Sequence, residues 1–346
     1  MQRLVANAEI GENNPMTSAA SVRIHVSQFP ENVRRDLLAS LRARRINHKF
    51  HYDSVKQTQK WLALHQAHSP ARTDADGRAV YARAFLAAAA KINSPAVHVI
   101  GLGCGGGQKD TQLLKLLKTG EREIVYTPCD VSTAMVLVAR RTALAVVPEK
   151  NCFPFVCDLA TADDLPQFLV SRHPSLVTFF GMIPNFEPQI ILPKLAALVR
   201  PKDLLLFSAN LAPGGDYAAG VKKILPQYDN PLTRDWLLAF LADLGVSLTA
   251  GRLQFAVEAG SAGLKRVVAD FHFSRTQRIE VDGERFDFRA GETLRLFFSY
   301  RYTPDRVREI LARYGLEVRE QWIARSEEEG VFLCRCSPGR TPRAPG

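Results

Sequence analysis

The chain has 346 residues, 46% of them hydrophobic, a composition typical of a soluble globular protein of about two domains. No apolar run approaches the roughly 20 residues needed to span a bilayer. The N-terminal sequence MQRLVANAEIGENNP lacks the apolar centre of a signal peptide, so we expect a cytosolic protein without membrane partners. The formal net charge of +10 comes from Lys and Arg scattered along the chain, which favours a solvated basic surface over nucleic-acid binding.

The six cysteines lie in or beside expected strands without paired C-x-x-C spacing, which indicates buried, reduced thiols. Cys334 and Cys336 point to one face of a strand, but no second pair accompanies them. Neither a disulfide framework nor a metal site is therefore expected.

The N-terminal part of the chain reads as a leader followed by helices. Residues 1–22 are polar and rich in Gly, Asn and Ser, which predicts a flexible leader. Helical spacing of apolar residues begins at Glu31. A further helix is expected at residues 79–92, after a linker at residues 68–74.

A strand at residues 97–103 runs into a glycine-rich turn and then into a helix at residues 109–117. Side-chain-free turns at the end of a buried strand let backbone N–H groups approach a ribose or a charged group. Gly101, Gly103 and Gly106 satisfy the spacing G-x-G-x-x-G, which does not separate NAD sites from S-adenosylmethionine sites. The loop therefore predicts a nucleotide-like ligand and leaves both cofactors open.

Carboxylates follow the next two strands at the same edge of the sheet. Residues 123–130 form a second strand that ends in Asp130, where an open α/β sheet offers an acceptor to ribose hydroxyls. Residues 153–159 form a third strand, whose Asp158 stands where an adenine amino group could be read. Both carboxylates are expected to contact the cofactor.

The remaining strands favour a methyltransferase over a dehydrogenase. A fourth strand is expected at residues 175–180 and a fifth at residues 204–207, after a helix and a Pro-containing turn. The chain closes with a helix at residues 304–314 and two strands, 316–322 and 330–336. Such a closing hairpin adds one antiparallel strand to an otherwise parallel sheet, which is the arrangement of class I methyltransferases.

A long insert separates the fifth strand from the closing helix. Residues 211–302 are too many for a loop. They contain a helix near residues 232–244 and alternating strands at 266–273, 276–281 and 293–300. At the C-terminal edge of the sheet, such an insert would cover the cofactor crevice and carry substrate specificity.

The expected fold is therefore α/β, with a class I (Rossmann-like) methyltransferase sheet and a second, smaller α+β substrate domain. The S-adenosylmethionine-binding domain would comprise residues 76–210 plus 303–337. The substrate-recognition domain would comprise residues 23–75 plus 211–302, and a flexible tail would follow at 338–346.

Between Lys49 and Cys336 the chain carries a series of short motifs. They are His51-Tyr52-Asp53, Ser69-Pro70-Ala71-Arg72-Thr73, the loop GLGCGGGQK, Cys129-Asp130-Val131-Ser132, GMIPNF at 181–186, Tyr228-Asp229-Asn230, and AGETLR at 290–295 followed by Ser299. Their order and spacing resemble the histidine-specific methyltransferase family. Its members include the histidine Nα-methyltransferase of ergothioneine biosynthesis and the fungal dimethylallyltryptophan N-methyltransferase. The resemblance implies S-adenosylmethionine as the methyl donor.

The resemblance also implies roles for single residues. The positions that surround S-adenosylmethionine in the family match Tyr52, Gly103, Gly105, Lys109, Asp130, Asp158 and Leu159. Lys109 would lie near the donor's carboxylate and Asp130 near its ribose. Asn185 and Tyr228 match positions that hold the backbone part of an amino-acid substrate, and with Tyr52 they form the expected catalytic group. Ser69 and Ser299 match positions on the substrate side of the pocket.

The substrate side departs from the family pattern. Where the histidine enzymes place a glutamate two residues before the serine, this chain has Phe297, between Leu296 and Phe298. The family's Tyr-Tyr-Pro-Thr-Arg segment reads His-Ser-Pro-Ala-Arg at residues 68–72, so a hydroxyphenyl group is lost. A pocket lined by Phe297 and Phe271 would leave the polar atoms of an imidazole unpaired. We therefore expect an amino acid, or an amine derived from one, with an apolar or aromatic side chain.

The expected chemistry is methyl transfer from a sulfonium to a neutral amine, which needs alignment and exclusion of water and no metal. Tyr52, Asp158 or bulk water could take the proton of the incoming ammonium. Three alternatives stay open: a histidine Nα-methyltransferase with a rearranged pocket, an NAD-linked oxidoreductase, and a non-catalytic protein that binds S-adenosylmethionine or nucleic acid. A small amino-acid-like partner and a monomer are favoured.

Overall fold

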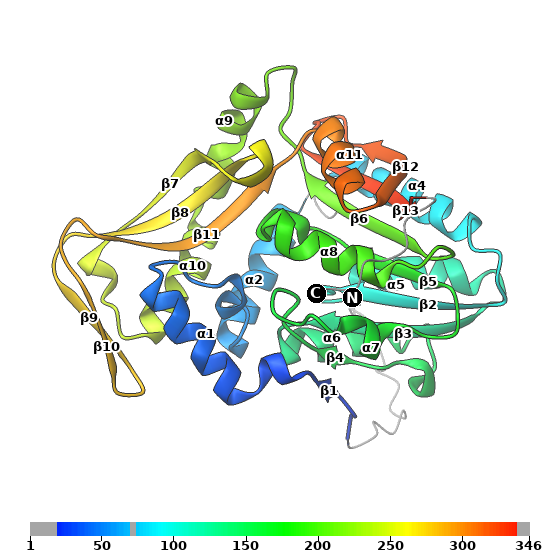
Figure 1. The fold of residues 1–346 in the computed structure, drawn as a ribbon, viewed down its shortest axis with the longest axis horizontal. Coiled ribbons are helices and arrows are strands. Elements are labelled where there is room, and N and C mark those ends of the chain that lie inside the picture. Colours follow the sequence, from blue (N-terminus) through cyan, green and yellow to red (C-terminus); the bar gives the residue numbers. More distant parts are fainter. Residues whose placement is uncertain (1–18, 70–73, 338–346) are drawn as a thin grey trace, which may run out of the picture.

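The computed structural model describes residues 19–69 and 74–337. In this structure a large, mostly parallel sheet with flanking helices stands beside a smaller antiparallel sheet (Figure 1). Residues 1–18 of the expected leader lie outside the described residues. The whole expected tail, residues 338–346, lies outside them as well. None of the helices in the described ranges is long and apolar enough to cross a membrane.

The large sheet has eight strands in the order β1-β4-β3-β2-β5-β6-β13-β12. Its strands are β1 (Arg23–Ile24), β2 (Ala96–Leu102), β3 (Glu123–Asp130), β4 (Phe155–Val156), β5 (Ser175–Phe179), β6 (Leu204–Asn210), β12 (Leu316–Ile323) and β13 (Glu329–Cys336). Neighbouring strands are parallel except where β13 pairs with β6 and β12. The sheet therefore carries one antiparallel strand, and the predicted class I methyltransferase fold is confirmed.

The strand order turns at β2, because β3 lies on one side of it and β5 on the other. In open α/β sheets, ligands bind outside the carboxyl ends of the strands at such a point. The expected cofactor loop follows β2, so the topology places it at this position.

Two hydrophobic clusters cover the two faces of the large sheet. Alternate residues of β2 point to opposite faces, so Val97 and Val99 join one cluster while Ile100 and Leu102 join the other. On the first face pack α4 (Ala75–Ala90), α5 (Gln108–Lys118) and the end of α6 (Thr133–Ala143). On the second face pack α7 (Leu165–Leu169), α8 (Pro188–Leu198) and α11 (Pro304–Arg313). Figure 1 shows α8 and α11 in front of the sheet.

The second part of the molecule has its own sheet and core. Its three-stranded sheet has the order β11-β8-β7, and a two-stranded ribbon, β9-β10, extends away from it (Figure 1). The elements are β7 (Gly251–Ala259), β8 (Lys265–Phe273), β9 (Gln277–Val281), β10 (Glu284–Phe288), β11 (Thr293–Arg301), α1 (Pro30–Arg42), α2 (Val55–His68), α9 (Tyr217–Tyr228) and α10 (Pro231–Asp243). A third hydrophobic cluster joins Leu41 of α1, Trp236 of α10 and Phe273 of β8.

Some element bounds differ from the sequence-based expectations. The third strand is much shorter than residues 153–159, because Pro154 has no N–H to donate and the chain turns at Asp158, which accepts the N–H of Ala160. Strands β7 and β10 and helices α2 and α9 were not predicted. Residues 23–24, expected in the substrate-recognition domain, pair with β4 of the large sheet. The division into two domains stays a prediction.

Candidate active site

The loop after β2 depends on two glycines. Gly103 and Gly105 have φ angles of +59° and +51°, in the left-handed region that favours glycine. A Cβ atom on Gly103 would lie 2.5 Å from Cγ of Met182, so a side chain has no space there. The loop can thus bring its backbone close to a molecule in the crevice, and helix α5 begins directly behind it at Gln108.

Asp130, the last residue of β3, faces this loop. One of its carboxylate oxygens accepts the N–H of Gly105 at 3.0 Å, and the other accepts the N–H of Ser132 at 3.0 Å. Burial raises the pKa of Asp130, while these two backbone N–H groups oppose the rise. The carboxylate braces the loop and leaves further lone pairs at the edge of the crevice, which fits the predicted contact with ribose hydroxyls.

A cavity is lined by Asp130, Asp158 and Leu159, all three expected to contact the cofactor. Its other walls include Asn47, His48, Lys49, Tyr52, Trp61, Gly103, Gly105, Val131, Met135, Cys157, Met182 and Phe186. Asp158 lies 3.2 Å from the Nζ atom of Lys49. A largely apolar slot with carboxylates among its walls suits an adenosine, whose flat base is apolar and whose hydroxyls need acceptors.

A second cavity adjoins the first and shares Tyr52 and both loop glycines among its walls. Lys109 lines it from the first turn of α5. The Nζ atom of Lys109 donates to the hydroxyl of Tyr81 at 2.7 Å, and that hydroxyl is hydrogen-bonded to the carboxylate of Glu329. The two cavities form one crevice, in which Lys49, Asp130 and Asp158 line the first part and Lys109 and Asp110 line the second.

Three of the predicted substrate residues meet at β11. Asn185 lines the second cavity, and its Nδ2 atom donates to the carbonyl oxygen of Phe298 at 3.0 Å. The hydroxyl of Tyr228 donates to Oγ of Ser299 at 2.9 Å and accepts from Nη2 of Arg301 at 2.8 Å. The structure therefore places Asn185, Tyr228 and Ser299 on or against one strand, and of the three Asn185 lines the second cavity while Tyr228 and Ser299 line neither.

Arg301 sets the direction of hydrogen bonding in this group. Its side chain is buried and also donates to the carbonyl oxygen of Leu211 at 3.0 Å. A guanidinium can only donate, so the Tyr228 oxygen accepts from Arg301 and the Tyr228 proton is directed to Ser299. The Ser299 hydroxyl keeps its own proton for a further hydrogen bond.

Phe297 stands in a cluster of aromatic rings. Its ring centre lies 5.1 Å from that of His48, 6.0 Å from that of Tyr228 and 6.0 Å from that of Trp236. Burial, and then the neighbouring His51, hold the pKa of the His48 imidazole well below its usual range, so this ring is neutral at pH 7. The buried Nε2 atom of His48 has no hydrogen-bond partner among the described residues. The surroundings of Phe297 are thus aromatic, and of these four rings only His48 lines one of the two cavities.

Sequence reasoning missed His48 and Trp236. His48 lies one turn before Tyr52, just outside the matched His-Tyr-Asp motif, so its position in the chain gave a hint. Trp236 lies in an almost wholly apolar segment that resembles any core helix, and it is in fact largely buried there. Contacts across the fold, and not spacing along the chain, bring both rings to Phe297.

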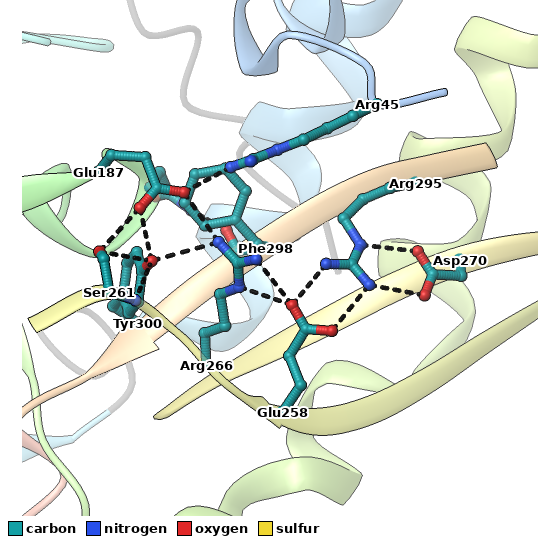
Figure 2. Close-up of polar contacts among 10 residues, drawn as sticks. Arg45, Glu187, Glu258, Ser261, Arg266, Asp270, Arg295, Phe298 and Tyr300 are labelled. Carbon is teal, nitrogen blue, oxygen red and sulfur yellow. Dashed lines mark hydrogen bonds and ion pairs between the residues drawn. The ribbon is translucent and has the colours of Figure 1, made fainter. Parts of the chain in front are cut away.

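Three carboxylates near β11 lie on the face of its sheet opposite to the Phe297 side chain. Side chains alternate along a strand, so Phe297 joins the core of the small sheet while Phe298 and Tyr300 join the core of the large one. Glu187, Glu258 and Asp270 pair with arginines on that other face, as Figure 2 shows. They supply no acid to the Phe297 side of β11.

Two further residues predicted to contact the substrate lie away from the cavities. Phe271 is 1% exposed, packs against Phe273 with ring centres 5.0 Å apart, and lines neither cavity. The alternation of Phe271 with Phe273 indicated a buried face of the strand. It did not indicate whether that face packs in the core or lines a pocket. Ser69 is buried at the end of α2, where its N–H donates to the carbonyl oxygen of His65 at 3.0 Å. Residues 70–73 lie outside the described part, and the role of Ser69 stays a prediction.

The crevice can bind and align charged small molecules. Tyr52 lines both cavities, and burial together with the nearby Asp130 carboxylate raises its pKa. Its hydroxyl is therefore protonated at pH 7 and offers hydrogen bonds without acting as a phenolate base. Within residues 19–69 and 74–337, no group of three or more His, Cys, Asp or Glu side chains is placed to hold a metal ion.

A family profile described as histidine-specific methyltransferase, SAM-dependent, matches residues 33–336. The N-methyltransferase imqF of Aspergillus flavus is 24% identical over 245 residues, 68% of this chain and 66% of that protein. The N-methyltransferase fsqC of Aspergillus fumigatus is 24% identical over 242 residues, 67% of this chain and 64% of that protein. The chain thus spans slightly under two thirds of the length of these relatives. The solved structure of magnesium protoporphyrin IX methyltransferase from Synechocystis PCC 6803 is 13% identical, with 84% of this chain and 97% of that chain covered and a TM-score of 0.46.

Proposed function

Since the chain belongs to the histidine-specific, S-adenosylmethionine-dependent methyltransferase family, we propose that it methylates the amino nitrogen of an amino acid or of an amine derived from one. The acceptor has an apolar or aromatic side chain and is not histidine. The observation that carries this proposal is that Asn185 lines the same cavity as the glycine loop and Lys109. An acceptor held by Asn185 would lie beside the donor. Family membership leaves no support for an NAD-linked oxidoreductase.

The donor would be held by residues at the carboxyl ends of β2, β3 and β4 and by the turn before α2. These are Tyr52, Gly103, Gly105, Lys109, Asp130, Asp158 and Leu159. When bound, S-adenosylmethionine supplies a sulfonium methyl group that passes to a neutral nitrogen as the carbon–sulfur bond breaks. Asp130 would accept hydrogen bonds from the ribose, and Lys109 would pair with the donor's carboxylate.

The acceptor would be held by Asn185 and by the hydrogen-bonded pair of Tyr228 and Ser299. The chain of donors from Arg301 through Tyr228 to Ser299 presents protons to a bound molecule, which suits a carboxylate. Tyr52 would accept an N–H of the acceptor and so orient the nitrogen lone pair. Because the Tyr52 hydroxyl keeps its own proton, Asp158 or water would take the proton that the ammonium loses.

The side chain of the acceptor would meet Phe297. Aromatic rings of His48, Tyr228 and Trp236 surround it, and burial keeps the His48 imidazole neutral at pH 7. Such a wall favours an apolar or aromatic side chain through its contact area. It would also stabilise an increasingly methylated, cationic nitrogen where a ring face is near. The names of the two fungal relatives support nitrogen as the methylated atom.

A histidine Nα-methyltransferase with a rearranged pocket is the second candidate. The family description favours it. The unpartnered Nε2 atom of His48 adds support, because a neutral imidazole nitrogen could accept the ring N–H of a histidine substrate. In this arrangement His48 would replace the missing glutamate.

Incubation with methyl-labelled S-adenosylmethionine and a panel of amino acids and their decarboxylated amines tests the proposal. Mass spectrometry of the products should show label on the amino nitrogen of at least one acceptor with an apolar or aromatic side chain. Label on oxygen or carbon, or on histidine alone, would contradict it. Cytosolic location and a monomeric state stay predictions from the sequence.

A further inference from the structure

Behind β11 lies a network of three arginines and three carboxylates that the proposed function does not use (Figure 2). They are Arg45, Arg266, Arg295, Glu187, Glu258 and Asp270. The network balances three positive against three negative charges. Glu187 is its most connected carboxylate, and it stands two residues after Asn185, directly before helix α8.

Glu187 joins three separate segments of the chain. One of its oxygens accepts from Arg45 at 2.6 Å and from Arg266 at 2.8 Å. The other accepts from the hydroxyl of Tyr300 at 2.6 Å and from that of Ser261 at 2.9 Å. Only 14% of its side chain is exposed. A carboxylate with four donors and little contact with water holds its neighbours more firmly than a surface ion pair does.

Two of these segments, those of Arg45 and Tyr300, lead to residues of the proposed acceptor site. Arg45 precedes the turn His48–His51 that carries the chain to Tyr52. The residue after Arg45, Ile46, donates its N–H to the carbonyl oxygen of Arg295 at 2.8 Å, which fastens this segment along the edge of β11. Tyr300 lies on β11 itself, next to Ser299.

Phe298 links the network to the acceptor face of β11. The guanidinium carbon of Arg45 lies 4.7 Å from the centre of its ring, and that of Arg266 lies 5.1 Å away. Both guanidinium groups are held by Glu187, so the ring is fixed by the same carboxylate. The Phe298 carbonyl accepts the hydrogen bond of Asn185 at 3.0 Å. The position of Asn185 therefore depends on Glu187 in two ways. Glu187 follows it by two residues in the chain, and Glu187 also fixes Phe298, whose carbonyl oxygen Asn185 contacts.

Glu187 is ionised throughout the pH range of an enzyme assay. Burial opposes its ionisation, but hydrogen bonds from Tyr300, Arg45 and Ser261 outweigh burial and lower its pKa to about 2. The contacts of the carboxylate are therefore those of the charged form.

We propose that Glu187 is a positioning residue for the methyl acceptor: it fixes the segments of Tyr52, Asn185 and Ser299 relative to one another without touching the substrate. This inference rests on the proposed function, because that function assigns the acceptor to these residues. Asp130 accepts from Gly105 and Ser132, and Lys109 donates to Tyr81, whereas Glu187 accepts from Arg45, Arg266, Tyr300 and Ser261. Donor binding should therefore not depend on Glu187.

The test compares Glu187→Gln with Asp270→Asn. Both replace a carboxylate of one network by an amide, but Asp270 contacts Arg295 alone and lies at the far end of the network from Glu187. Tyr300→Phe removes one donor to Glu187 without changing any charge, and it serves if Glu187→Gln does not fold. Hydrogen–deuterium exchange of the unliganded variants needs no turnover, so it examines the positioning role even if the proposed function were wrong.

Glu187→Gln, and more weakly Tyr300→Phe, should speed exchange in peptides covering 183–187 and 297–301, while Asp270→Asn leaves both peptides as in the wild type. In assays with the identified acceptor, Glu187→Gln should raise KM for the acceptor about tenfold or more. Its Kd for S-adenosylhomocysteine should stay within about twofold of wild type, because donor residues lie elsewhere. Equal exchange in Glu187→Gln and Asp270→Asn, or a parallel loss of donor and acceptor affinity, would overturn the proposal.

Discussion

Replacing Asp130 by alanine should weaken binding of S-adenosylhomocysteine while leaving a folded protein. The carboxylate lies at the carboxyl end of β3, and each of its oxygens already accepts one backbone N–H, from Gly105 and from Ser132. A hydrogen bond from a ribose hydroxyl to this charged group contributes about 1.5–3 kcal/mol. Asp130→Ala should therefore raise the Kd roughly 10- to 150-fold.

The same substitution also leaves two backbone N–H groups without their acceptor, so a loss of stability must be separated from a loss of binding. Asp203 is a matched control, because it is buried and accepts the N–H groups of Ser175 at 2.7 Å and Arg200 at 2.9 Å, at the opposite end of the sheet. Thermal unfolding should show both variants destabilised, and calorimetry should show weakened ligand binding in Asp130→Ala alone. An unchanged Kd in folded Asp130→Ala, or equal weakening in Asp203→Ala, would refute the assignment of Asp130 to the donor.

Three further predictions concern the acceptor and the effect of pH. Asn185→Ala should abolish turnover and leave the Kd for S-adenosylhomocysteine within about twofold of the wild-type value. If calorimetry showed that binding of S-adenosylhomocysteine is lost together with turnover, Asn185 would instead hold the methyl donor or stabilise the fold. Phe297→Glu should raise kcat/KM for histidine relative to phenylalanine about tenfold or more, since one charge-assisted hydrogen bond contributes about 1.5–3 kcal/mol; an unchanged ratio would show that residue 297 does not select the side chain. Burial lowers the pKa of His98 from 6.5 to about 4, so the unfolded chain binds more protons between these values and stability falls as pH drops through this window. At pH 5 the loss should reach about 2 kcal/mol, and urea unfolding of His98→Gln should show a flatter pH dependence than the wild type.

The fold was predictable where the chain follows simple periods. Short, mostly apolar runs before turns marked β2, β3, β5 and β6, and the closing helix and hairpin completed the order of the sheet. The two-residue strand β1 was not predicted, because it is held by pairing with β4 and has too few residues to show a pattern. Strand β4 was expected at residues 153–159, but only Phe155–Val156 pair with β3. Strand β7 is mostly half-exposed, so its sequence lacks a clear apolar face.

The site was predictable in part, and the matched motifs were the reason. Gly103, Asp130 and Asn185 were identified from the motifs in which they stand, and the structure places them in adjoining cavities. Phe271 was misplaced because its alternation with Phe273 indicates only that this face of the strand is buried. The same alternation is expected whether the face lines a pocket or, as here, packs in the core. The position of Glu187 in a network of arginines from β8, β11 and the segment after α1 depends on tertiary contacts that no local spacing encodes.

We expect this family member to methylate the amino nitrogen of an apolar or aromatic acceptor and not that of histidine. In a competition assay, equal concentrations of histidine, tryptophan, tyrosine and phenylalanine compete for limiting labelled S-adenosylmethionine, and mass spectrometry measures the N-methylated products. Label on the aromatic amino acids should exceed label on histidine. Preferential methylation of histidine would contradict it and would point to His48 as the group that replaces the missing glutamate.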